Sequence, residues 1–513
     1  MMYRPSRRSL LALPALLTAR KAFAQSRLEQ RVEVQAGSPG AVVRPELHGH
    51  FAEHLGACTY GGLWVGPNSP IPNINGHRKQ AVEYLQQLGI PVLRWPGGCF
   101  ADDYHWRDGI GPRARRPKRV NIWWGMYTED NSFGTHEFIE LCRLIGAEPY
   151  LAGNLGSGTP QEMRDWVEYC NYPSGSTLSD ERAANGAAEP FKVKYWGVGN
   201  ENWGCGGRMT PEEYAGQYRR FANYIGVRTG FGGVAPYLIA CGPSSNDVDW
   251  TQRFFAASPR GVTLHGYAMH FYQRYRQRAV KYTPEQMREQ FVRFDEMEKA
   301  IVQQRGLLDR NDPKRRIDLL IDEWGIWDDA DPEEEKRLGK LWQQITMRCA
   351  TGAALGLNVF HRQADKVTMG NIAQIVNVIH SLLLTHEDKC IRTPAYYAFE
   401  LAKPHRGRQS VPARVQGSGG ALSISASRDE RELVFTAVNP LHDVPMALDC
   451  AVAGAKIASA SARLLHHADL NACNTFDKPD TIVPRNHPVQ TAAGRIQLEL
   501  PALGVCTVTA RLA

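Results

Sequence analysis

Strand-like and helix-like runs alternate eight times between residues 44 and about 387, and this alternation limits the fold more than any other feature of the chain. The strand-like runs are short and rich in β-branched and aromatic residues, whereas the runs between them repeat apolar residues at spacings of three and four. Such units in succession are typical of a (β/α)8 barrel with its helices outside. We expect its strands at 44–54, 91–96, 148–154, 192–201, 237–241, 262–272, 317–323 and 357–362.

Amphipathic runs between these strands predict the outer helices. The clearest covers 284–304, where Met287, Phe291 and Phe294 lie on one stripe at helical spacing. Helices are expected at 76–88, 135–145, 160–171, 211–229, 284–304, 333–355 and 373–385.

The pattern changes after about Thr393. Helical periodicity stops, and strand-like runs follow at 421–426, 432–437, 458–465 and 505–512, separated by Gly, Pro, Asn and Asp residues. These runs predict a β-sandwich, to which the early run 28–36 adds a strand. We therefore expect an α/β protein made of an N-terminal leader (1–24), a strand segment that joins the sandwich (25–43), a (β/α)8 TIM barrel (44–392) and a C-terminal all-β sandwich (393–513).

The leader has the three parts of an export signal. Arg7 and Arg8 precede a short apolar run, and Ala22-Phe23-Ala24 offers a small-residue cleavage site, so we expect cleavage after Ala24. The arginine pair resembles the twin-arginine type. The sequence therefore predicts an exported bacterial protein, periplasmic or extracellular. No membrane partner is expected, because no later run approaches the ~20 apolar residues that span a bilayer.

Charge and cysteine content exclude other classes. The formal charge of +7 falls to +2 without the five basic residues of 1–24, so no nucleic-acid partner is expected. The densest basic patch, 113–119, lies in a proline-flanked loop that we interpret as solvated or as a subunit contact, with a polyanion site as the alternative. The eleven cysteines include no C-x-x-C pair, so free and mostly buried thiols are expected.

Two glutamates end predicted strands. The stretch 192–207, KVKYWGVGNENWGCGG, reads as a strand that stops at Glu201, followed by a glycine-rich turn and a helix start at Thr210-Pro211. A second strand delivers Asp322-Glu323 to a loop of tryptophans. Active sites of parallel barrels lie at the carboxyl ends of the strands. Two such carboxylates beside aromatic rings suit hydrolysis of a sugar bond. The alternative is that both are solvated loop acids.

These residues, together with longer motifs, carry a resemblance to a known family. The motifs are Gly49-His50-Phe51-Ala52-Glu53-His54, Leu93-Arg94-Trp95-Pro96-Gly97-Gly98-Cys99-Phe100 running on to 104–112, Asn200-Glu201, and Asn371-Ile372-Ala373-Gln374. They resemble glycoside hydrolase family 51, mainly α-L-arabinofuranosidases, within the clan of barrel glycosidases whose acid/base follows strand four and whose nucleophile follows strand seven. Our strand count places Glu201 after the fourth strand and Glu323 after the seventh.

The resemblance implies a role for each matching residue. Glu201 is expected to be the general acid/base and Glu323 the nucleophile of a retaining mechanism, with the carboxyls about 5 Å apart. Asn200 is expected to hydrogen-bond the 2-hydroxyl of the sugar. Glu53 and Gln374 are expected to bind other hydroxyls, Cys99 to lie against the ring, and Tyr272 to orient the nucleophile. Plain packing is the alternative for Cys99, Tyr272 and Gln374.

Other chemistries find less support. His48, His50 and His54 cluster, but no second group completes a coordination sphere, so no metal is expected. No dinucleotide fingerprint, P-loop or G-x-S-x-G motif occurs, and no cofactor is expected.

The resemblance implies an exo-acting enzyme that releases terminal non-reducing α-L-arabinofuranosyl residues from arabinan, arabinoxylan or derived oligosaccharides. Two alternatives are a glycosidase on this scaffold that acts on a β-glucan or β-xyloside, and a carbohydrate-binding protein without activity. The resemblance also implies a homo-oligomer, for which a hexamer is one form.

Overall fold

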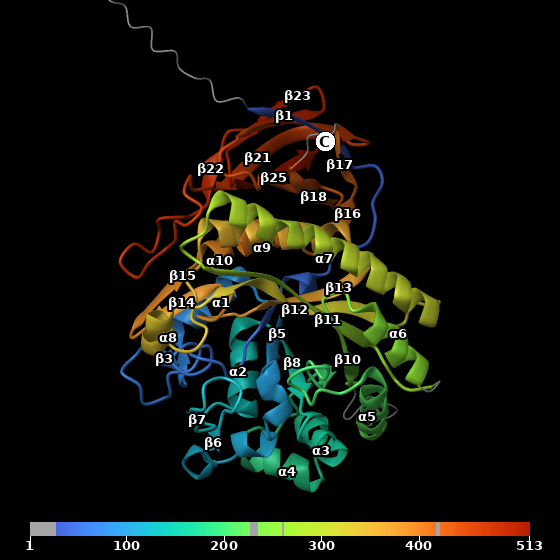
Figure 1. Ribbon diagram of the computed structural model, residues 1–513, viewed down its shortest axis with the longest axis vertical. Helices are drawn as coiled ribbons and strands as arrows, with labels where there is room; N and C mark the ends of the chain where they lie inside the picture. Colours follow the sequence, from blue (N-terminus) through green and yellow to red (C-terminus); the bar gives the residue numbers. More distant parts are fainter. Residues whose placement is uncertain (1–26, 226–233, 259–260, 417–420) are drawn as a thin grey trace, which may run out of the picture.

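The computed structural model describes residues 27–225, 234–258, 261–416 and 421–513. The predicted leader, 1–24, lies outside the described residues. A barrel occupies the centre of the molecule, and a β-sandwich lies at one end of the molecule, beyond the outer helices of the barrel (Figure 1). Two long helices, α7 (Pro284–Asn311) and α9 (Met347–Arg362), run between the two parts. The predicted combination of a (β/α)8 barrel with a C-terminal all-β region is confirmed.

Eight parallel strands close the barrel in chain order, with the last strand pairing to the first. Side chains from seven of them, including Tyr150, Tyr195 and Met369, form one buried apolar cluster inside the barrel. The strands are β2 (Gly49–Phe51), β5 (Val92–Trp95), β8 (Glu148–Gly153), β9 (Tyr195–Val198), β10 (Tyr237–Ser244), β11 (Gly266–Arg278), β12 (Asp318–Asp329) and β13 (Val367–Ala373).

The prediction of the eighth strand at 357–362 was wrong. Those residues end helix α9, and the strand is β13. Helix α9 is covered by the barrel on one side and the sandwich on the other, so residues on all its faces are buried, including Leu357 and Phe360. An apolar run of this kind cannot be told from a buried strand by periodicity.

The helix predicted at 373–385 is also wrong. Its residues end β13, form a buried loop and begin β14 (Leu383–His386), which pairs with β15 (Lys389–Arg392). The apolar residues that imitated a helical stripe, among them Ile375 and Val376, are buried because the loop packs against the barrel.

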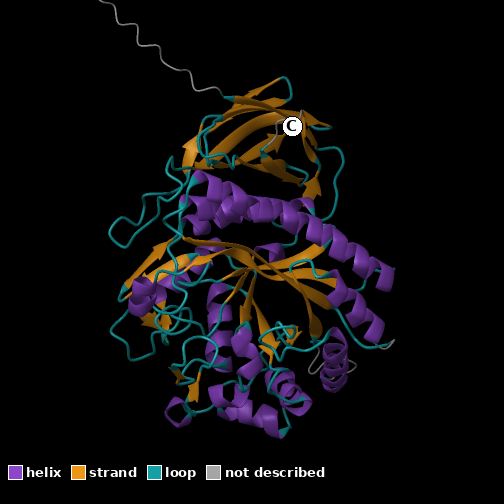
Figure 2. Cartoon of the chain, in the orientation of Figure 1, coloured by secondary structure: helices purple, strands orange, loops and turns teal. Residues whose placement is uncertain are grey.

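The remaining helices surround the barrel (Figure 2). Four of the described helices, α7 among them, begin in the same way, with proline at the first position and a threonine whose hydroxyl accepts a backbone N–H: Thr159, Thr210, Thr283 and Thr393. None of the described helices combines the length and the apolar character needed to cross a bilayer. They are α1 (Lys79–Leu88), α2 (Thr135–Ile145), α3 (Pro160–Asn171), α4 (Thr177–Ala184), α5 (Pro211–Tyr224), α6 (Val248–Ala257), α8 (Pro332–Leu338) and α10 (Pro394–Ala402).

The sandwich consists of a six-stranded and a five-stranded sheet. The first has the order β16 (Gln409–Val411), β18 (Ser423–Arg428), β19 (Glu432–Val438), β25 (Val505–Leu512), β21 (Ile457–Leu465) and β22 (Arg485–His487). The second has the order β17 (Ala413–Gln416), β1 (Leu28–Gln35), β20 (Met446–Ala453), β24 (Arg495–Leu500) and β23 (Gln490–Ala492). Strand β1 therefore lies inside a sheet, parallel to β20 and antiparallel to β17.

The junction between barrel and sandwich is polar as well as apolar. His48 and His361 bring their Nε2 atoms to 2.9 Å, and both ring nitrogens of His405 contact hydroxyls of the sandwich, Ser427 and Thr436. All three histidines are buried, and burial lowers the pKa of each. Neutral imidazoles are therefore built into this junction.

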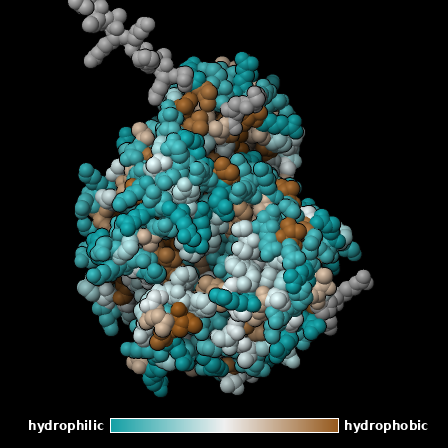
Figure 3. All heavy atoms as spheres, viewed as in Figure 1, coloured by the Kyte–Doolittle hydropathy of each residue, from teal (hydrophilic) through white to brown (hydrophobic). Residues whose placement is uncertain are grey.

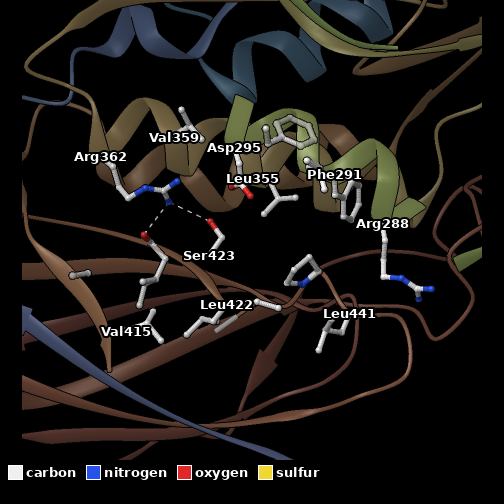
Figure 4. A pocket seen from close by; sticks show the side chains of 16 residues that line it. Arg288, Phe291, Asp295, Leu355, Val359, Arg362, Val415, Leu422, Ser423 and Leu441 are labelled. Atoms are coloured by element: carbon white, nitrogen blue, oxygen red, sulfur yellow. Dashed lines mark hydrogen bonds between the residues drawn. The ribbon is translucent and has the colours of Figure 1, made fainter. Parts of the chain in front are cut away.

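A cavity of about 420 Å³ lies at the same junction, between α7, α9 and the sandwich. Apolar side chains such as Phe291 and Leu422 line it, and Arg362 crosses its edge to reach the Ser423 hydroxyl (Figure 4). The face in Figure 3 is mostly hydrophilic, with separated hydrophobic patches.

Ion pairs neutralise most of the positive charges in the basic loop 113–119. Arg113 and Arg116 both pair with the buried Glu137, and Arg119 pairs with Asp108. Three of its five cations therefore have carboxylate partners within the chain.

Candidate active site

Glu201 lies three residues beyond strand β9, in a backbone conformation that is unusual for a residue other than glycine. Its φ of 42° lies in the left-handed region, which costs a non-glycine residue about 1 kcal/mol. The turn is held on both sides: the Gly204 and Gly206 N–H groups donate to the Glu201 carbonyl at 2.6 and 3.1 Å, and Asn200 N–H donates to Asp102 Oδ2 at 2.8 Å. This turn directs the Glu201 carboxyl into the barrel mouth.

Glu323 lies within β12, and only 5% of it is exposed. Each of its carboxylate oxygens has a separate donor. Arg94 Nη1 donates to Oε1 at 2.7 Å, and the Tyr272 hydroxyl donates to Oε2 at 2.7 Å. Glu323 is therefore fixed in orientation from two strands, β5 and β11.

The carboxylates of Glu201 and Glu323 face one another with His270 beside both. One oxygen of each carboxylate and the His270 Nδ1 all lie within 4.8 Å of one another. Nδ1 is 2.9 Å from Glu201 Oε1 and 3.5 Å from Glu323 Oε2. Carboxyl pairs about 5 Å apart allow direct attack on a sugar carbon, whereas wider pairs leave room for a water.

The surroundings favour an ionised Glu323. Burial alone would raise its pKa, but the charges of His270 and Arg94 and the Tyr272 hydrogen bond lower it below the ordinary value. The reverse holds for His270, since burial would lower its pKa but the carboxylates of Glu323 and Glu201 raise it. Glu323 and His270 therefore stabilise each other's charged forms.

Glu53 and Gln374, which follow strands β2 and β13, are joined by a hydrogen bond. Gln374 Nε2 donates to Glu53 Oε2 at 2.9 Å, while Trp124 Nε1 and the Phe100 N–H donate to Oε1 at 2.9 and 3.1 Å. Burial and the charge of Glu323 raise the pKa of Glu53 to about 7. Glu53 is thus a polar group that can hold or give up a proton near neutral pH.

A glycine allows the chain to pass between Glu53 and Glu323. A Cβ at Gly98 would lie 2.9 Å from Glu323 Oε1 and 3.4 Å from Glu53 Oε1. The strand-to-loop turn after β5 therefore approaches both carboxylates more closely than a side chain would allow.

Arg94 joins the two halves of the site. Besides Glu323, it donates through Nη2 to Asn200 Oδ1 at 2.5 Å and pairs through Nε with Asp322 at 3.3 Å. Asp322 in turn accepts hydrogen bonds from Tyr150 and Asn371. A fully buried arginine thus holds both sequence motifs, 200–201 and 322–323, in one network.

Cys99 forms a disulfide with Cys205, contrary to the expectation of free thiols. The two cysteines are 106 residues apart, so no local spacing predicted the pair. Cys205 Sγ lies 3.6 Å from Glu201 Oε2. The disulfide therefore ties the loop after β5 to the loop that carries Glu201.

All seven residues expected at the site lie around one barrel mouth. His270 connects Glu201 with Glu323, and Tyr272 binds Glu323. Glu53 binds Gln374. Asn200 and the disulfide partner of Cys99 belong to the loop that carries Glu201. Their roles remain predictions.

Four residues that were not predicted from the sequence complete the site: Arg94, Asp102, Trp124 and His270. Arg94 lies in the motif that begins at Leu93, and His270 lies two residues before Tyr272. Each is near the end of a predicted strand, and that position was the available signal. Asp102 is buried and accepts N–H groups from 155, 156 and 200, and burial raises its pKa to about 7. Trp124 comes from a long loop whose path no pattern indicated.

A surface cavity of about 540 Å³ begins at Trp124. Tyr127 and residues near α8, including Glu335 and Lys340, line the rest of it. Because the same indole donates to Glu53, the cavity adjoins the carboxylate pocket.

Comparison with known proteins gives a consistent picture. Residues 84–299 match the Alpha-L-arabinofuranosidase 1 domain, and residues 322–503 match the Alpha-L-arabinofuranosidase C-terminal domain. The chain is 39% identical over 491 residues to an intracellular exo-alpha-L-arabinofuranosidase of Bacteroides ovatus, a match that covers 93% of this chain and 95% of the relative. It is 33% identical to alpha-L-arabinofuranosidase C of Emericella nidulans, over 73% of this chain and 74% of that one.

Solved structures agree. The GH51 arabinofuranosidase of Xanthomonas axonopodis pv. citri has a TM-score of 0.90 and 34% identity and covers 94% of this chain and 100% of its own. The arabinose complex of the Thermotoga maritima alpha-L-arabinofuranosidase has a TM-score of 0.84 and 29% identity, with the same coverage.

The predicted export is contradicted by these comparisons. The Bacteroides ovatus relative, which matches nearly the whole chain, is named as an intracellular enzyme. The pattern of charge and apolar residues at 1–24 was therefore insufficient evidence for an exported protein.

Proposed function

Since the chain belongs to the α-L-arabinofuranosidases of glycoside hydrolase family 51, and is thus a glycoside hydrolase, we propose that it works by a retaining double displacement with Glu323 as nucleophile and Glu201 as general acid/base. The observation that carries this mechanism is the approach of the two carboxylates to within 4.8 Å. That separation suits direct attack by a carboxylate on the anomeric carbon.

Glu323 has the environment of a nucleophile. Its oxygens accept hydrogen bonds from Arg94 and Tyr272, which favour the ionised carboxylate and fix its orientation. Its burial excludes competing water. In the first step a Glu323 oxygen bonds to the anomeric carbon while the bond to the departing oxygen breaks. The product is a covalent arabinosyl ester.

Glu201 supplies and later removes the proton. Its carboxyl protonates the departing oxygen in the first step and takes a proton from water in the second. His270, at 2.9 Å, fixes one oxygen of Glu201 and leaves the other directed at the Cys205 side of the pocket. The negative charge of Glu323, which faces Glu201 in the first step, disappears when the ester forms.

The arabinofuranose ring is held by the polar walls. We assign Asn200 to the 2-hydroxyl, a contact that strengthens in the transition state. Glu53 and Gln374, already joined at 2.9 Å, grip other hydroxyls, and the Cys99 sulfur lies along the ring. The surface cavity beside Trp124 receives the departing sugar, so arabinan, arabinoxylan and their oligosaccharides are the proposed substrates.

The test is the stereochemistry of the first product. Reaction of p-nitrophenyl α-L-arabinofuranoside in the presence of methanol is expected to yield methyl α-L-arabinofuranoside, whose anomer is identified by NMR because a methyl glycoside, unlike free arabinose, does not mutarotate. The β-anomer would exclude double displacement. The corresponding xyloside and glucoside are expected to react far more slowly, and equal rates would support the β-xyloside or β-glucan alternative instead.

The roles of the remaining parts follow from this assignment. We propose that residues 44–392 form the catalytic unit and that 393–513, with the strand from 25–43, support it. We also propose a homo-oligomer. Support comes from exposed apolar side chains in one loop, Val120, Ile122, Trp123 and Met126. Light scattering would show a mass well above one chain, and a monomer at all concentrations would contradict this.

A further inference from the structure

The Cys99–Cys205 disulfide is the one bonded pair among the eleven cysteines, all of which lie in the described residues. Eight of the other nine are buried thiols, and Cys473 is half-buried. Domains that depend on disulfides for their fold are dense in them. Here the pair lies only at the pocket of the catalytic glutamates, which points to a function at that place.

The sulfur atoms and Glu201 form a compact group. Both Sγ atoms and one Glu201 carboxylate oxygen lie within 4.8 Å of one another, and all three residues are partly exposed to solvent. The oxygen nearest to Cys205 is Oε2, at 3.6 Å. His270 contacts the other oxygen, Oε1, so Oε2 keeps a lone pair directed toward the sulfur atoms.

We propose that, after reduction of the disulfide, Cys99, Cys205 and Glu201 form a binding site for Zn²⁺ or another thiophilic divalent cation, and that the bound cation stops catalysis. Thiolate sulfur and carboxylate oxygen are zinc ligands at about 2.3 and 2.0–2.2 Å, and three protein ligands leave a fourth position for water. Ligand atoms around tetrahedral zinc are about 3.5 Å apart, which the group reaches with small side-chain rotations.

Reduction of the disulfide and binding of the cation are two separate steps. A phosphine reductant donates two electrons to the S–S bond and becomes a phosphine oxide with oxygen from water, and the two protons of that water complete the two thiols. Binding of the cation then displaces both thiol protons. The metal-bound Glu201 can neither protonate a departing oxygen nor accept a proton from water.

The pocket contains a competing group of ligands. Glu201, His270 and Glu323 also place one ligand atom each within 4.8 Å of one another. This second group is present whether or not the disulfide is reduced. Dependence on the redox state therefore distinguishes the two sites.

Cobalt provides a readout that is independent of hydrolysis. Purified full-length protein would be reduced with a phosphine and titrated with Co²⁺, and the untreated disulfide form would be titrated in parallel. We expect thiolate-to-cobalt charge-transfer absorption that saturates at equimolar metal in the reduced form and is absent from the oxidised form. Absence of this band in the reduced form would overturn the proposal even if the enzyme is a retaining glycosidase as proposed above.

Zinc and activity provide the second readout. In the reduced form, equimolar Zn²⁺ is expected to lower the rate on an aryl arabinofuranoside with a poor leaving group by about 10²-fold, because the acid is lost, and a chelator should restore it. Equal inhibition of the oxidised form would assign the metal to the Glu201–His270–Glu323 group and overturn the proposal.

Variants identify the ligands. C99S and C205S are each expected to lose the charge-transfer band, whereas the matched variant C473S, at a half-buried thiol away from the site, should keep it. E201Q should keep the band but bind Co²⁺ more weakly. A band that survives in C205S would place the metal at other thiols. Comparison of oxidised and reduced wild-type protein needs no variant, so the proposal stays testable if one fails to fold.

Discussion

The Tyr272 hydroxyl donates to Glu323 Oε2 at 2.7 Å, on the opposite side of the carboxylate from Arg94. Tyr272 comes from β11 and Glu323 from β12, which are paired strands of the barrel wall. The orientation of the proposed nucleophile therefore depends on the register between these two strands.

Replacing Tyr272 by phenylalanine is expected to lower kcat by about 10- to 100-fold, because a hydrogen bond to a charged group is worth about 1.5–3 kcal/mol. The same change removes a contact that lowers the pKa of Glu323, so the acidic limb of the pH–rate profile should move to higher pH. Loss of rate without any movement of that limb would assign Tyr272 to the sugar alone.

Replacing Glu323 by alanine is expected to abolish turnover of an aryl arabinofuranoside and to leave a space beside the anomeric carbon. Added azide should restore some activity and give a β-arabinosyl azide, because it attacks in place of the carboxylate. The anomer can be identified by NMR. No rescue, together with an intact fold by circular dichroism, would argue against the nucleophile assignment.

Replacing Glu201 by alanine is expected to have effects that depend on the leaving group. Substrates with good leaving groups should form the ester at nearly the normal rate, whereas poor ones should lose about 10²- to 10⁴-fold because they need the proton. A Brønsted plot of kcat/KM against leaving-group pKa measures this difference. An equal loss for all leaving groups would indicate a structural role.

The G98A variant is expected to lose activity without losing its fold. The added methyl would lie 2.9 Å from Glu323 Oε1 and displace the carboxylate, and misplacement near 1 Å can cost about 10²-fold in rate. G216A is the matched control, because a Cβ at that position in α5 meets nothing within 4 Å. The control should keep full activity, with a stability equal to wild type or up to about 1 kcal/mol higher.

Acid is expected to destabilise the junction between barrel and sandwich. Burial lowers the pKa of His405 from 6.5 to about 3, so the unfolded chain binds its proton more readily than the folded chain does. Each such histidine therefore removes up to about 1.4 kcal/mol of stability per pH unit as pH falls below 6.5, until its folded-state pKa is reached.

Urea unfolding between pH 7 and 4 measures this dependence. H405Q, which keeps hydrogen-bonding capacity toward Ser427 and Thr436, should show a shallower loss than wild type. H467Q, outside the junction, is the control and should follow the wild-type curve. A wild-type slope in H405Q would assign the acid sensitivity to other groups.

Helix bounds were predictable where one face of the helix is buried and the other exposed, and short buried strands were predictable where turn residues flank them. Residues 92–95 and 148–153 form strands inside their predicted ranges, and helices α2 and α3 have the predicted bounds. The failures at 357–362 and 373–385 lie where the chain is covered on every side. Periodicity carries no information there, because no residue faces water.

The proposed catalytic pair was accessible from sequence because each glutamate ends a strand predicted from the sequence, and active sites of parallel barrels lie at the carboxyl ends of the strands. The residues that set its chemistry were less accessible. Arg94 contacts four residues from three separate segments, and Trp124 reaches Glu53 from a loop 71 residues away. Such contacts between distant residues form only when the barrel has folded.

Strand β1 pairs in its sheet with β17 and β20, which are synthesised about 380 and 418 residues after it. The barrel strands, which end at Ala373, are complete before either neighbour exists. Until then the 28–35 segment is an unpaired edge, open to chaperones or to the same segment of another nascent chain. The sheet that holds this segment can thus be completed only after all the barrel strands have been synthesised.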